Sequence, residues 1–450
     1  MTDAIEGARP DAAGRPSLLA ADRRTRARNA AERRFRLYGM IAVGLGLAAL
    51  VVLLSTVAIK GAGAFRQTYV SLGVDLAEAK LDKTGNRDIE AIKKVSTFGY
   101  TPLIQEALVR KVDELGLRPD GMSDKDIGGI VSKDAAAQLR DRVIADPMLI
   151  GTRTRVDLLA TGRIDGYFKG RVSLASAERD SNVTPDQIRL AQALAEAGVV
   201  VTRFNWGFVT RPDASDQRPE AAGLGVAILG SLYMMLIVLV LALPIGVAAS
   251  IYLEEFAPRN RWTDLIEVNI ANLAAVPSIV FGILGLAIFI NFAGLPQSAP
   301  IVGGLVLTLM TLPTIIISTR ASLKSVPPSI RDAALGVGAS KMQSVFHHVL
   351  PLAAPGILTG TIIGLAQALG ETAPLLLIGM VAFVNDYPAA PPEGFFDPAS
   401  ALPVQIYNWT QRADPAFVER ASGAIIVLLL FLVAMNALAV ILRRRFERRW

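Results

Sequence analysis

The chain has 450 residues, a hydrophobic fraction of 52%, a mean hydropathy of +0.42 and a net charge of +6. At this length such values indicate several membrane spans joined to one soluble part. The chain contains no cysteine, which excludes disulfides, thiolate zinc sites and cysteine nucleophiles.

Arginines concentrate at both ends of the chain, in residues 23–36 and 443–449, and each group directly adjoins an apolar run. Such groups can bind nucleic acid, but their position favours the flank of a membrane helix that faces anionic cytoplasmic lipid. We therefore expect residues 1–36 and 443–450 to be basic cytoplasmic ends whose partner is membrane lipid, with no nucleic acid bound. The first apolar run follows a long polar segment, so we expect a retained span and not a cleaved signal peptide.

Six apolar runs approach the roughly 20 residues that cross a hydrocarbon core. In chain order they cover about 37–59, 224–252, 267–293, 300–319, 356–384 and 421–442. Lysine and arginine gather in loops 253–266 and 320–350, whereas loop 385–420 is mainly acidic. Because basic loops stay in the cytoplasm, this pattern predicts an all-α, multi-pass membrane protein with six transmembrane helices and both termini inside.

The segment between the first two spans, residues 60–223, is long enough to form its own domain outside the membrane. Residues 68–77 alternate like a strand, and residues 101–115 carry leucine and valine at helical spacing. Thr184 and Gln187 form a capping box that would begin another helix. We predict an inserted α+β domain in the periplasm, without a catalytic constellation.

Loop 320–350 carries the signals of two short helices. In chain order these signals are Pro327, Pro328, Ser329 with Asp332, Gly336, Gly338, Ser340 with Gln343, and Pro351. The prolines should end the helices before them, each serine should cap a new helix, and the glycines should separate the two. A solvated loop that happens to be helical is one interpretation. The other is a stiff element whose small residues let another protein approach closely.

The stretch "DAALGVGASKMQSVFHHVLP" (332–351) resembles the EAA loop of ABC importer permeases. The matching residues are Asp332, Ala333, Ala334, Gly338, Leu350 and Pro351, with Asp in place of the usual Glu and His348 where an aliphatic residue is commoner. The resemblance implies a MetI-like type I permease fold with a core over 224–442. It also implies that residues 329–340, with Ser329 and Ser340 as caps, dock into a cleft of a separate ATPase.

We expect no covalent chemistry in this chain. "GVGASK" (336–341) lacks the P-loop spacing that cradles phosphates, so ATP and Mg should be bound by the partner ATPase and no cofactor by this chain. His347 and His348 point about 100° apart on a helix and make a poor pair of ligands, so we expect no metal site.

Three further stretches resemble the PstA-type permease of the phosphate importer, over about 204–442. They are "NWGFVT" (205–210), "NLAAVPSIVFGILG" (272–285) and "ALGETAPLLLIG" (368–379). The resemblance implies a bacterial inner-membrane importer of inorganic phosphate, with a homologous PstC-type permease, a PstB-type ATPase dimer and a PstS-type periplasmic phosphate-binding protein.

The chain departs from that family at two positions. Well-known members carry arginines where this sequence has Gln367 and Ile317. Arg320, one turn beyond Ile317, could replace one of them. Without these arginines, phosphate would have to be bound by hydroxyls, amides and helix N-termini of this chain, or by cations of the partner permease. A similar oxyanion therefore stays open as the substrate, as does the pairing of the chain with a copy of itself.

Glu371 lies in an apolar run, where an isolated charge costs about 2.5–3.5 kcal/mol on insertion scales. One interpretation places it in the translocation path or gate with Gln367, Thr372 and Arg320, paired with a basic group of the neighbouring subunit. The other makes it a structural carboxyl, protonated by burial or hydrogen-bonded to Thr372 or Gln367. A direct bond to phosphate is not expected, because two anions repel each other.

Two rival classes compete with an ABC permease. An ion-coupled secondary transporter must hold its own coupling site, usually with inverted repeats, and no repeat stands out here. A membrane-tethered sensor needs only one span.

The sequence leaves the role of residues 60–223 open between docking a binding protein, shielding the entrance and contacting the partner permease.

Overall fold

The computed structural model describes residues 23–82, 85–380 and 383–446. Residues 1–22 and 447–450, the outer parts of the two expected basic ends, and residues 381–382 of the expected fifth span lie outside the described residues. The chain divides into two compact units, residues 1–57 and 58–450, and each is described by itself.

The first unit is dominated by α1 (Arg23–Gly61), a helix of 39 residues that continues from the basic flank through the first apolar run. At 1.5 Å per residue it is about 58 Å long, more than a hydrocarbon core requires. Its apolar side chains are exposed, with Leu45 at 67% and Val52 at 65%. A helix that is apolar on all sides needs lipid or another protein around it, which agrees with the span expected at 37–59.

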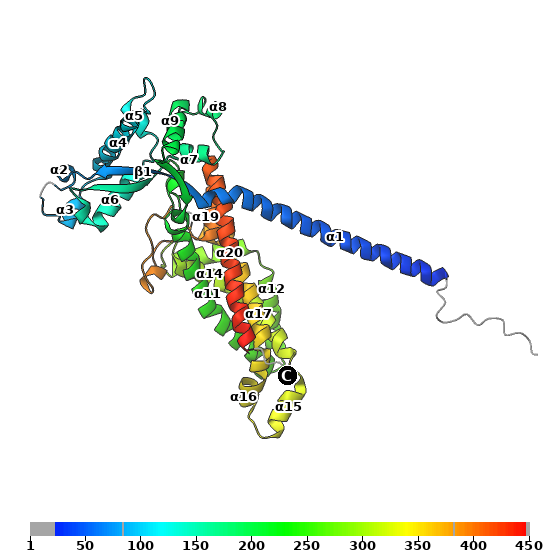
Figure 1. The fold of residues 1–450 in the computed structure, drawn as a ribbon. Helices are drawn as coiled ribbons and strands as arrows, with labels where there is room; N and C mark the ends of the chain where they lie inside the picture. Colours follow the sequence, from blue (N-terminus) through cyan, green and yellow to red (C-terminus); the bar gives the residue numbers. More distant parts are fainter. Residues whose placement is uncertain (1–22, 83–84, 381–382, 447–450) are drawn as a thin grey trace, which may run out of the picture. The chain divides into compact units, whose positions relative to one another are not determined.

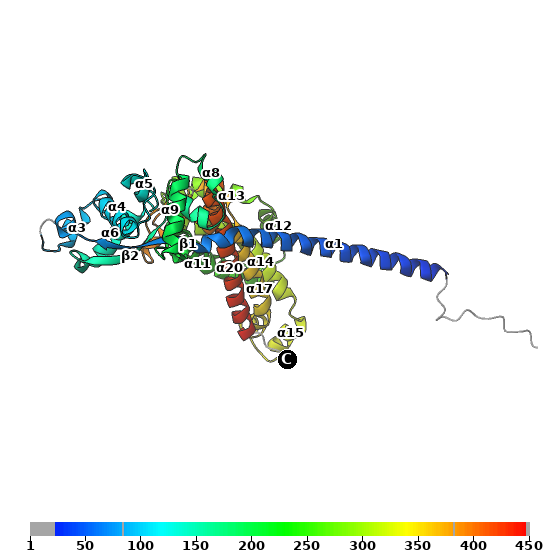
Figure 2. The same cartoon turned by 45° about the horizontal axis from the view of Figure 1, so that its top comes forward.

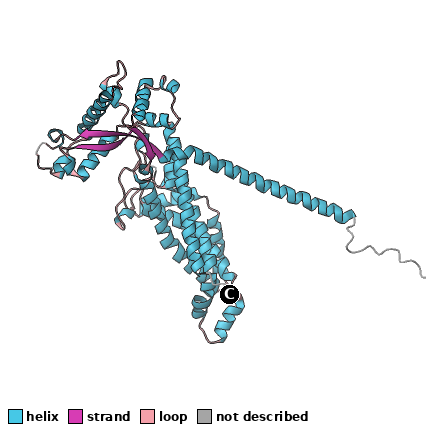
Figure 3. Ribbon diagram, viewed as in Figure 1, coloured by secondary structure: helices cyan, strands magenta, loops and turns pink. Residues whose placement is uncertain are grey.

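The second unit begins with a three-stranded antiparallel sheet in the order β2-β1-β3. Its strands are β1 (Arg66–Asp75), β2 (Arg153–Leu159) and β3 (Val200–Phe204). β1 is central, with Tyr69 opposite Leu159 and Arg66 opposite Phe204. Strands and surrounding helices are distinguished by colour in Figure 3. The strand expected at 68–77 is therefore confirmed, two residues earlier than its alternation indicated.

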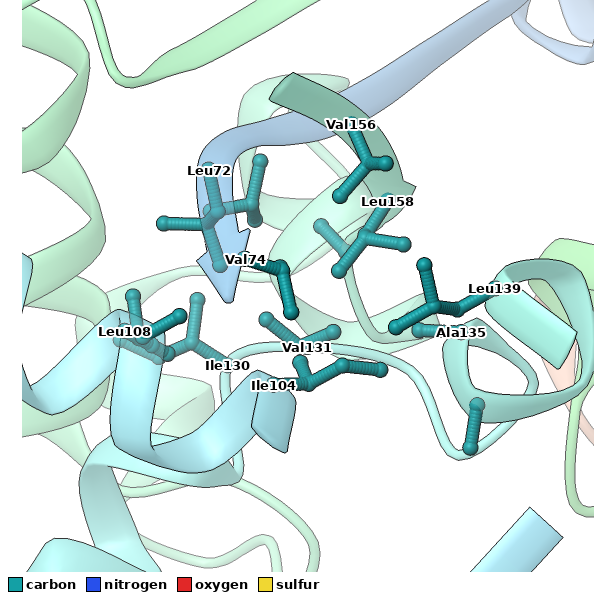
Figure 4. Packing of buried hydrophobic residues seen from close by; sticks show 14 of the residues in the cluster. Leu72, Val74, Ile104, Leu108, Ile130, Val131, Ala135, Leu139, Val156 and Leu158 are labelled. Carbon is teal, nitrogen blue, oxygen red and sulfur yellow. The ribbon is translucent and has the colours of Figure 1, made fainter. Parts of the chain in front are cut away.

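Helices enclose this sheet and share one core with it. We call the sheet and these helices, residues 66–204, the sheet domain. The helices are α2 (Glu78–Leu81), α3 (Ile89–Lys93), α4 (Thr97–Glu114), α5 (Asp124–Gly128), α6 (Ala135–Ala145), α7 (Gly162–Phe168), α8 (Leu174–Ala177) and α9 (Pro185–Glu196). Leu72 and Val74 of β1 lie together with Ile104 of α4 and Leu139 of α6 in that core (Figure 4). The helix expected at 101–115 is α4, and the Thr184 capping box begins α9 as expected.

After α10 (Trp206–Thr210) the chain enters a helical bundle. Its long helices are α11 (Gly225–Ile251), α14 (Pro300–Lys324), α17 (Leu350–Gly370) and α20 (Pro415–Phe446), and its shorter ones are α12 (Arg261–Ala274), α13 (Ser278–Gly285), α18 (Ala373–Leu377) and α19 (Leu402–Gln411). α11 packs on α14, α14 on α17, and α17 on α20. Met234, Val238 and Val306 lie in the apolar core between them.

Glycines bring α17 close to α14. Gly356, Gly360 and Gly364 are spaced four residues apart, so they lie on one face of α17. A Cβ atom built on Gly360 would lie 2.0 Å from Oγ of Ser318, and one built on Gly356 would lie 2.4 Å from Oγ of Ser322. Small residues at this spacing are the usual means by which membrane helices pack closely.

The third expected span, 267–293, is not a continuous helix. α12 and the pair α13 with its π-turn, Leu286–Phe292, meet at a bend of 101°, and Pro277 is the N-cap of α13. Proline lacks the N–H that an uninterrupted helix needs and keeps the preceding residue out of the helical region. Among the described residues five helices are long and apolar enough to span a membrane, and the count reaches six only if this bent pair is one span.

The fifth expected span, 356–384, begins and ends earlier than its apolar run. The described membrane-length helix covers Lys341–Gly370 and includes a π-turn at Val345–Val349. Pro351, expected to end a helix, instead lies in the first turn of α17. The π-turn just before Pro351 already interrupts the regular hydrogen-bond pattern of this helix, and the missing N–H of the proline is accommodated there.

Within the second unit, the sheet and the loop helices lie at opposite ends of the bundle (Figures 1 and 2). α20 begins against the sheet domain, where Lys169 binds Glu419 at 3.0 Å. Near its other end Arg443 donates to Thr359, in the first half of α17, at 3.2 Å. The bundle therefore separates the sheet domain from the loop that follows α14.

Candidate functional site

Two short helices occupy loop 320–350, as expected: α15 (Pro328–Gly336) and α16 (Lys341–Ser344). We call residues 325–344 the elbow. Ser340 and Gln343 form the expected capping box, with Gln343 N donating to Ser340 Oγ at 3.2 Å. Ser329 does not cap α15, because Pro328 occupies the first helical position and moves the N-cap to Pro327.

Gly338 joins the two short helices. Its φ of +89° is in the left-handed region that glycine adopts without strain. Its N–H donates to Leu335 O, and Ala339 N–H donates to Ala334 O, so the last carbonyls of α15 are satisfied. The turn between α15 and α16 therefore has a defined shape.

An acidic turn at the end of α11 holds the elbow. The π-turn Tyr252–Phe256 contains Glu255, whose carboxylate accepts from Arg331 at 2.7 Å. Arg331 also donates to the carbonyl oxygens of Leu323 at 2.9 Å and Val326 at 2.8 Å. One guanidinium thus joins α15 to the end of α14 and to α11.

A second set of ion pairs lies beside the first. Glu254 pairs with Arg320 at 3.4 Å and with Lys324 at 3.5 Å, and Arg320 also binds Glu267 of α12 at 2.6 Å. Three bundle helices and the elbow therefore meet at carboxylates that our sequence reasoning missed. The signal was present as an acidic pair, "EE" at 254–255, in the loop that also carries Arg259 and Arg261.

The elbow exposes apolar side chains away from these ion pairs. Leu335 is 48% exposed, Val337 86% and Met342 58%, and Phe346, two residues beyond the elbow, is 44% exposed. Of the residues that match the EAA pattern, Asp332, Ala333 and Gly338 are exposed on the elbow and Ala334 is buried beneath it, whereas Leu350 and Pro351 lie at the start of α17. An exposed apolar surface on a stiff support is suited to docking a partner.

Glu371 lies in a break between helices and not inside a span. It has extended backbone angles, φ −77° and ψ 129°, directly after α17, and α18 begins at Ala373 with Pro374 in its first turn. The apolar run concealed this break, which lies between Gly370, a residue of low helix propensity, and Pro374, which is tolerated in the first turn of α18.

The segment after the break is held firmly. Ser298 donates its hydroxyl to Gly379 O at 2.5 Å and its N–H to Ile378 O at 3.2 Å. A Cβ atom on Gly282 of α13 would lie 2.7 Å from Cα of Pro374, so α13 approaches α18 closely. The position of Glu371 is therefore fixed from both sides.

The carboxylate of Glu371 makes no hydrogen bond or ion pair with any residue that the structure describes, including Thr372 and Gln367. Glu371 and Thr372 are half-buried and Gln367 is exposed. Arg320 lies elsewhere: it is next to the elbow, whereas Glu371 follows the far end of α17, a helix of 21 residues and about 30 Å. The structure therefore does not bring the four expected path residues into one cluster.

Two family models match the chain. A domain of unknown function (DUF3333) matches residues 22–178, and the binding-protein-dependent transport system inner membrane component matches residues 242–450.

Curated proteins and solved structures are similar to a part of this chain. The probable ABC transporter permease protein YqgI of Bacillus subtilis (strain 168) is 32% identical over 250 residues, which are 53% of this chain and 83% of that protein. The phosphate transport system permease protein PstA of Mycobacterium leprae (strain TN) is 31% identical over 265 residues, 58% of this chain and 83% of that protein. An inward-facing MetNI methionine ABC transporter structure aligns with 50% of this chain and 97% of its own at 17% identity and a TM-score of 0.38.

The curated relatives are matched over most of their own length, and residues 242–450, which the transport family model matches, hold the elbow, Glu371 and the bundle from within α11 onward. The chain belongs to the PstA-type ABC transporter permeases, multi-pass inner-membrane proteins with the MetI-like fold.

Proposed function

We propose that this chain is a transmembrane subunit of an importer for inorganic phosphate and forms half of its translocation path. The relatives named as phosphate transport permeases support the substrate, at 31% identity for PstA of Mycobacterium leprae. The structure of the elbow is the main observation that supports this mechanism. A separate ATPase that binds ATP and Mg would move the elbow, and the chain itself does no covalent chemistry.

The arrangement of the second unit supports an assignment of sides. The sheet domain and the elbow lie at opposite ends of the bundle, so they belong on opposite sides of the membrane (Figure 1). With the elbow and the basic termini in the cytoplasm, residues 60–223 lie in the periplasm. The chain then has six spans, with the bent pair of α12 and α13 counted as one.

The exposed face of the elbow is the docking surface in this proposal. Leu335, Val337 and Met342 would enter a groove of a PstB-type ATPase, and the ion pairs of Glu254 and Glu255 would pass its motion to α11, α12 and α14. A homologous PstC-type permease would supply the other half of the path. A PstS-type binding protein would deliver phosphate from the periplasm.

Glu371, Thr372 and Gln367 would act at the end of α17 that is distant from the elbow. The carboxylate of Glu371 has no partner among the described residues, which supports a basic partner on the second permease. Ile317 and Gln367 stand where the family carries arginines, and this keeps another oxyanion as the second candidate substrate.

A pair of glycine variants tests the docking role. Gly336 and Gly338 both face open space, but only Gly338 needs a positive φ. Gly338→Val should distort the elbow and abolish co-purification with the ATPase, because β-branched residues avoid positive φ. Gly336→Val is the matched control and should retain the ATPase. Equal retention by both variants would count against the elbow as the docking element.

Uptake measurements separate the two substrates. Vesicles that contain the assembled importer should take up labelled phosphate with ATP inside, and excess sulfate should not compete. If sulfate competes as strongly as unlabelled phosphate does, the importer accepts oxyanions other than phosphate.

A further inference from the structure

A cavity of about 830 Å³ lies where the sheet domain meets the start of α20. Its wall comes from α4, α5, the start of α7, α9, residues 216–220 and Asp414, which directly precedes α20. We call it the junction cavity. Its volume falls in the range of small-molecule sites, about 300–1,000 Å³. It lies outside residues 242–450 except for Asp414, so most of it is separate from the part shared with transport permeases.

Most charges in the wall are already neutralised. Arg163 pairs with Asp180 at 2.8 Å and with Asp414 at 3.4 Å, and Asp216 pairs with Arg412 at 3.1 Å. Two cations remain, Lys125 and Lys133. Their ammonium groups have no hydrogen bond or ion pair within residues 23–82, 85–380 and 383–446.

The remaining acid in the wall is Glu220. It is 5% exposed, and its carboxylate accepts a hydrogen bond from the hydroxyl of Ser132. Burial raises the pKa of the Glu220 carboxyl, although the bond from Ser132 opposes this. Lys125 and Lys133 are therefore the charged groups of the wall that lack a partner among the described residues, and both are exposed, so their ammonium groups are free to bind an anion.

The uncharged part of the wall is mixed. Gln105, Thr161 and Asn182 offer amides and a hydroxyl, while Ile104, Leu108 and Val131 offer apolar surface. A few polar groups on a partly apolar wall suit an organic molecule, and a bare inorganic ion would fill only a small part of this volume.

We propose that the junction cavity binds a small anionic organic molecule that carries a phosphate or carboxylate group. Lys125 and Lys133 bind its anionic group, and the amides of the wall bind its hydroxyl groups. The proposal does not depend on the substrate of the importer.

The position of the cavity connects its occupant to the membrane. Arg420 of α20 donates to Glu220 O at 2.8 Å and to Ala222 O at 2.5 Å, directly behind the wall. A ligand that touches both the sheet domain and Asp414 therefore stabilises their contact. We expect bound ligand to raise the midpoint of thermal unfolding of the full chain.

Binding to the full-length chain in lipid nanodiscs tests the proposal by calorimetry. The probes are glucose 6-phosphate, citrate and inorganic phosphate, with neutral glucose as the control ligand. Glucose 6-phosphate or citrate should bind and glucose should not. Lys125→Gln and Lys133→Gln should each weaken binding by about tenfold, as loss of a charged hydrogen bond does.

Lys94→Gln is the matched control variant, since Lys94 is exposed and is not part of the cavity wall. Its affinity should stay within about twofold of the wild type, because it changes only distant surface charge. The proposal is overturned if none of the three anions binds, if inorganic phosphate alone binds, if glucose binds equally well, or if the two cavity variants bind like the wild type.

Discussion

A single arginine fixes the elbow to the bundle. Arg331 binds the carboxylate of Glu255 through two nitrogens, Nε at 3.1 Å and Nη2 at 2.7 Å, while also donating to two carbonyl oxygens. Only a guanidinium has donors in the fork geometry that such a set requires. The side chain of Glu255 is 7% exposed, and Arg331 is the cation that compensates its burial.

Arg331→Gln should therefore loosen the elbow, with a destabilisation of about 1–3 kcal/mol for the unpaired carboxylate. Arg331→Lys should recover only part of this, because lysine cannot make the bidentate contact. The readout is ATP hydrolysed per phosphate imported, which should rise in both variants. Lys324→Gln is the control, because its pair with Glu254 is 59% exposed on the lysine side and worth about 0–1 kcal/mol. An unchanged ratio for Arg331→Gln would show that this contact does not transmit motion.

Glu371 is the second residue whose role can be measured. Glu371→Gln keeps the shape of the side chain and removes its charge, so assembly and ATPase docking should persist. Uptake should fall by about tenfold, the effect of losing about 1.4 kcal/mol of stabilisation in one step of the cycle. Glu393→Gln, an exposed acid of the 385–420 loop, should transport normally. Wild-type uptake by Glu371→Gln would remove Glu371 from the path or gate.

At the scale of elements, glycine spacing sets how closely α17 approaches α14. Gly360→Ala would place a methyl group 2.0 Å from Oγ and 2.3 Å from Cβ of Ser318. Gly364→Ala, one turn along the same face, would meet its nearest atom at 3.5 Å, an ordinary contact. Overpacking of this kind costs about 1–3 kcal/mol, so Gly360→Ala should lower thermal stability and Gly364→Ala should not. Equal unfolding midpoints for the two variants would contradict the packing described for these helices.

Elements could be predicted where their signals are local. The capping boxes at Thr184 and Ser340 correctly marked the starts of α9 and α16, because both partners lie within four residues. The spans expected at 267–293 and 356–384 are interrupted, at Pro277 and at Glu371. The apolar run continues on both sides of each break. An apolar composition predicts that a segment lies in an apolar environment, but it does not predict that the segment is one continuous helix. The glycine face of α17 was missed, since its meaning depends on Ser318 and Ser322 of another helix.

At the scale of the whole molecule, a buried ion cluster joins the sheet domain to α20. Lys169 binds Asp165 at 2.7 Å and Glu419 at 3.0 Å, and Arg171 binds Glu419 at 2.6 Å. The side chains of Lys169 and Asp165 are only 6% and 2% exposed. Sequence could not reveal this cluster, because Lys169 and Glu419 are 250 positions apart. A separation of 76 positions likewise concealed the pairing of Glu255 with Arg331.

Lys169→Met should weaken this junction, because it removes one of the two cations, Lys169 and Arg171, that pair with both Asp165 and Glu419. Removing one partner of a buried pair costs about 3–5 kcal/mol. Hydrogen exchange should become faster in α7 and in the first turns of α20. Arg189→Met breaks an exposed pair, 64% and 59% exposed, and should change stability by no more than about 0.5 kcal/mol. Unchanged exchange in Lys169→Met would mean that the sheet domain is held to α20 by other contacts.

The central claim is that an external motor acts through the elbow to drive phosphate across the membrane. Proteoliposomes make the direct test, with labelled phosphate and the binding protein outside and ATP inside. The complete complex should accumulate phosphate only when ATP is hydrolysed, and the Gly338→Val complex should not accumulate it. Accumulation by this chain alone, without an ATPase or nucleotide, would contradict the account.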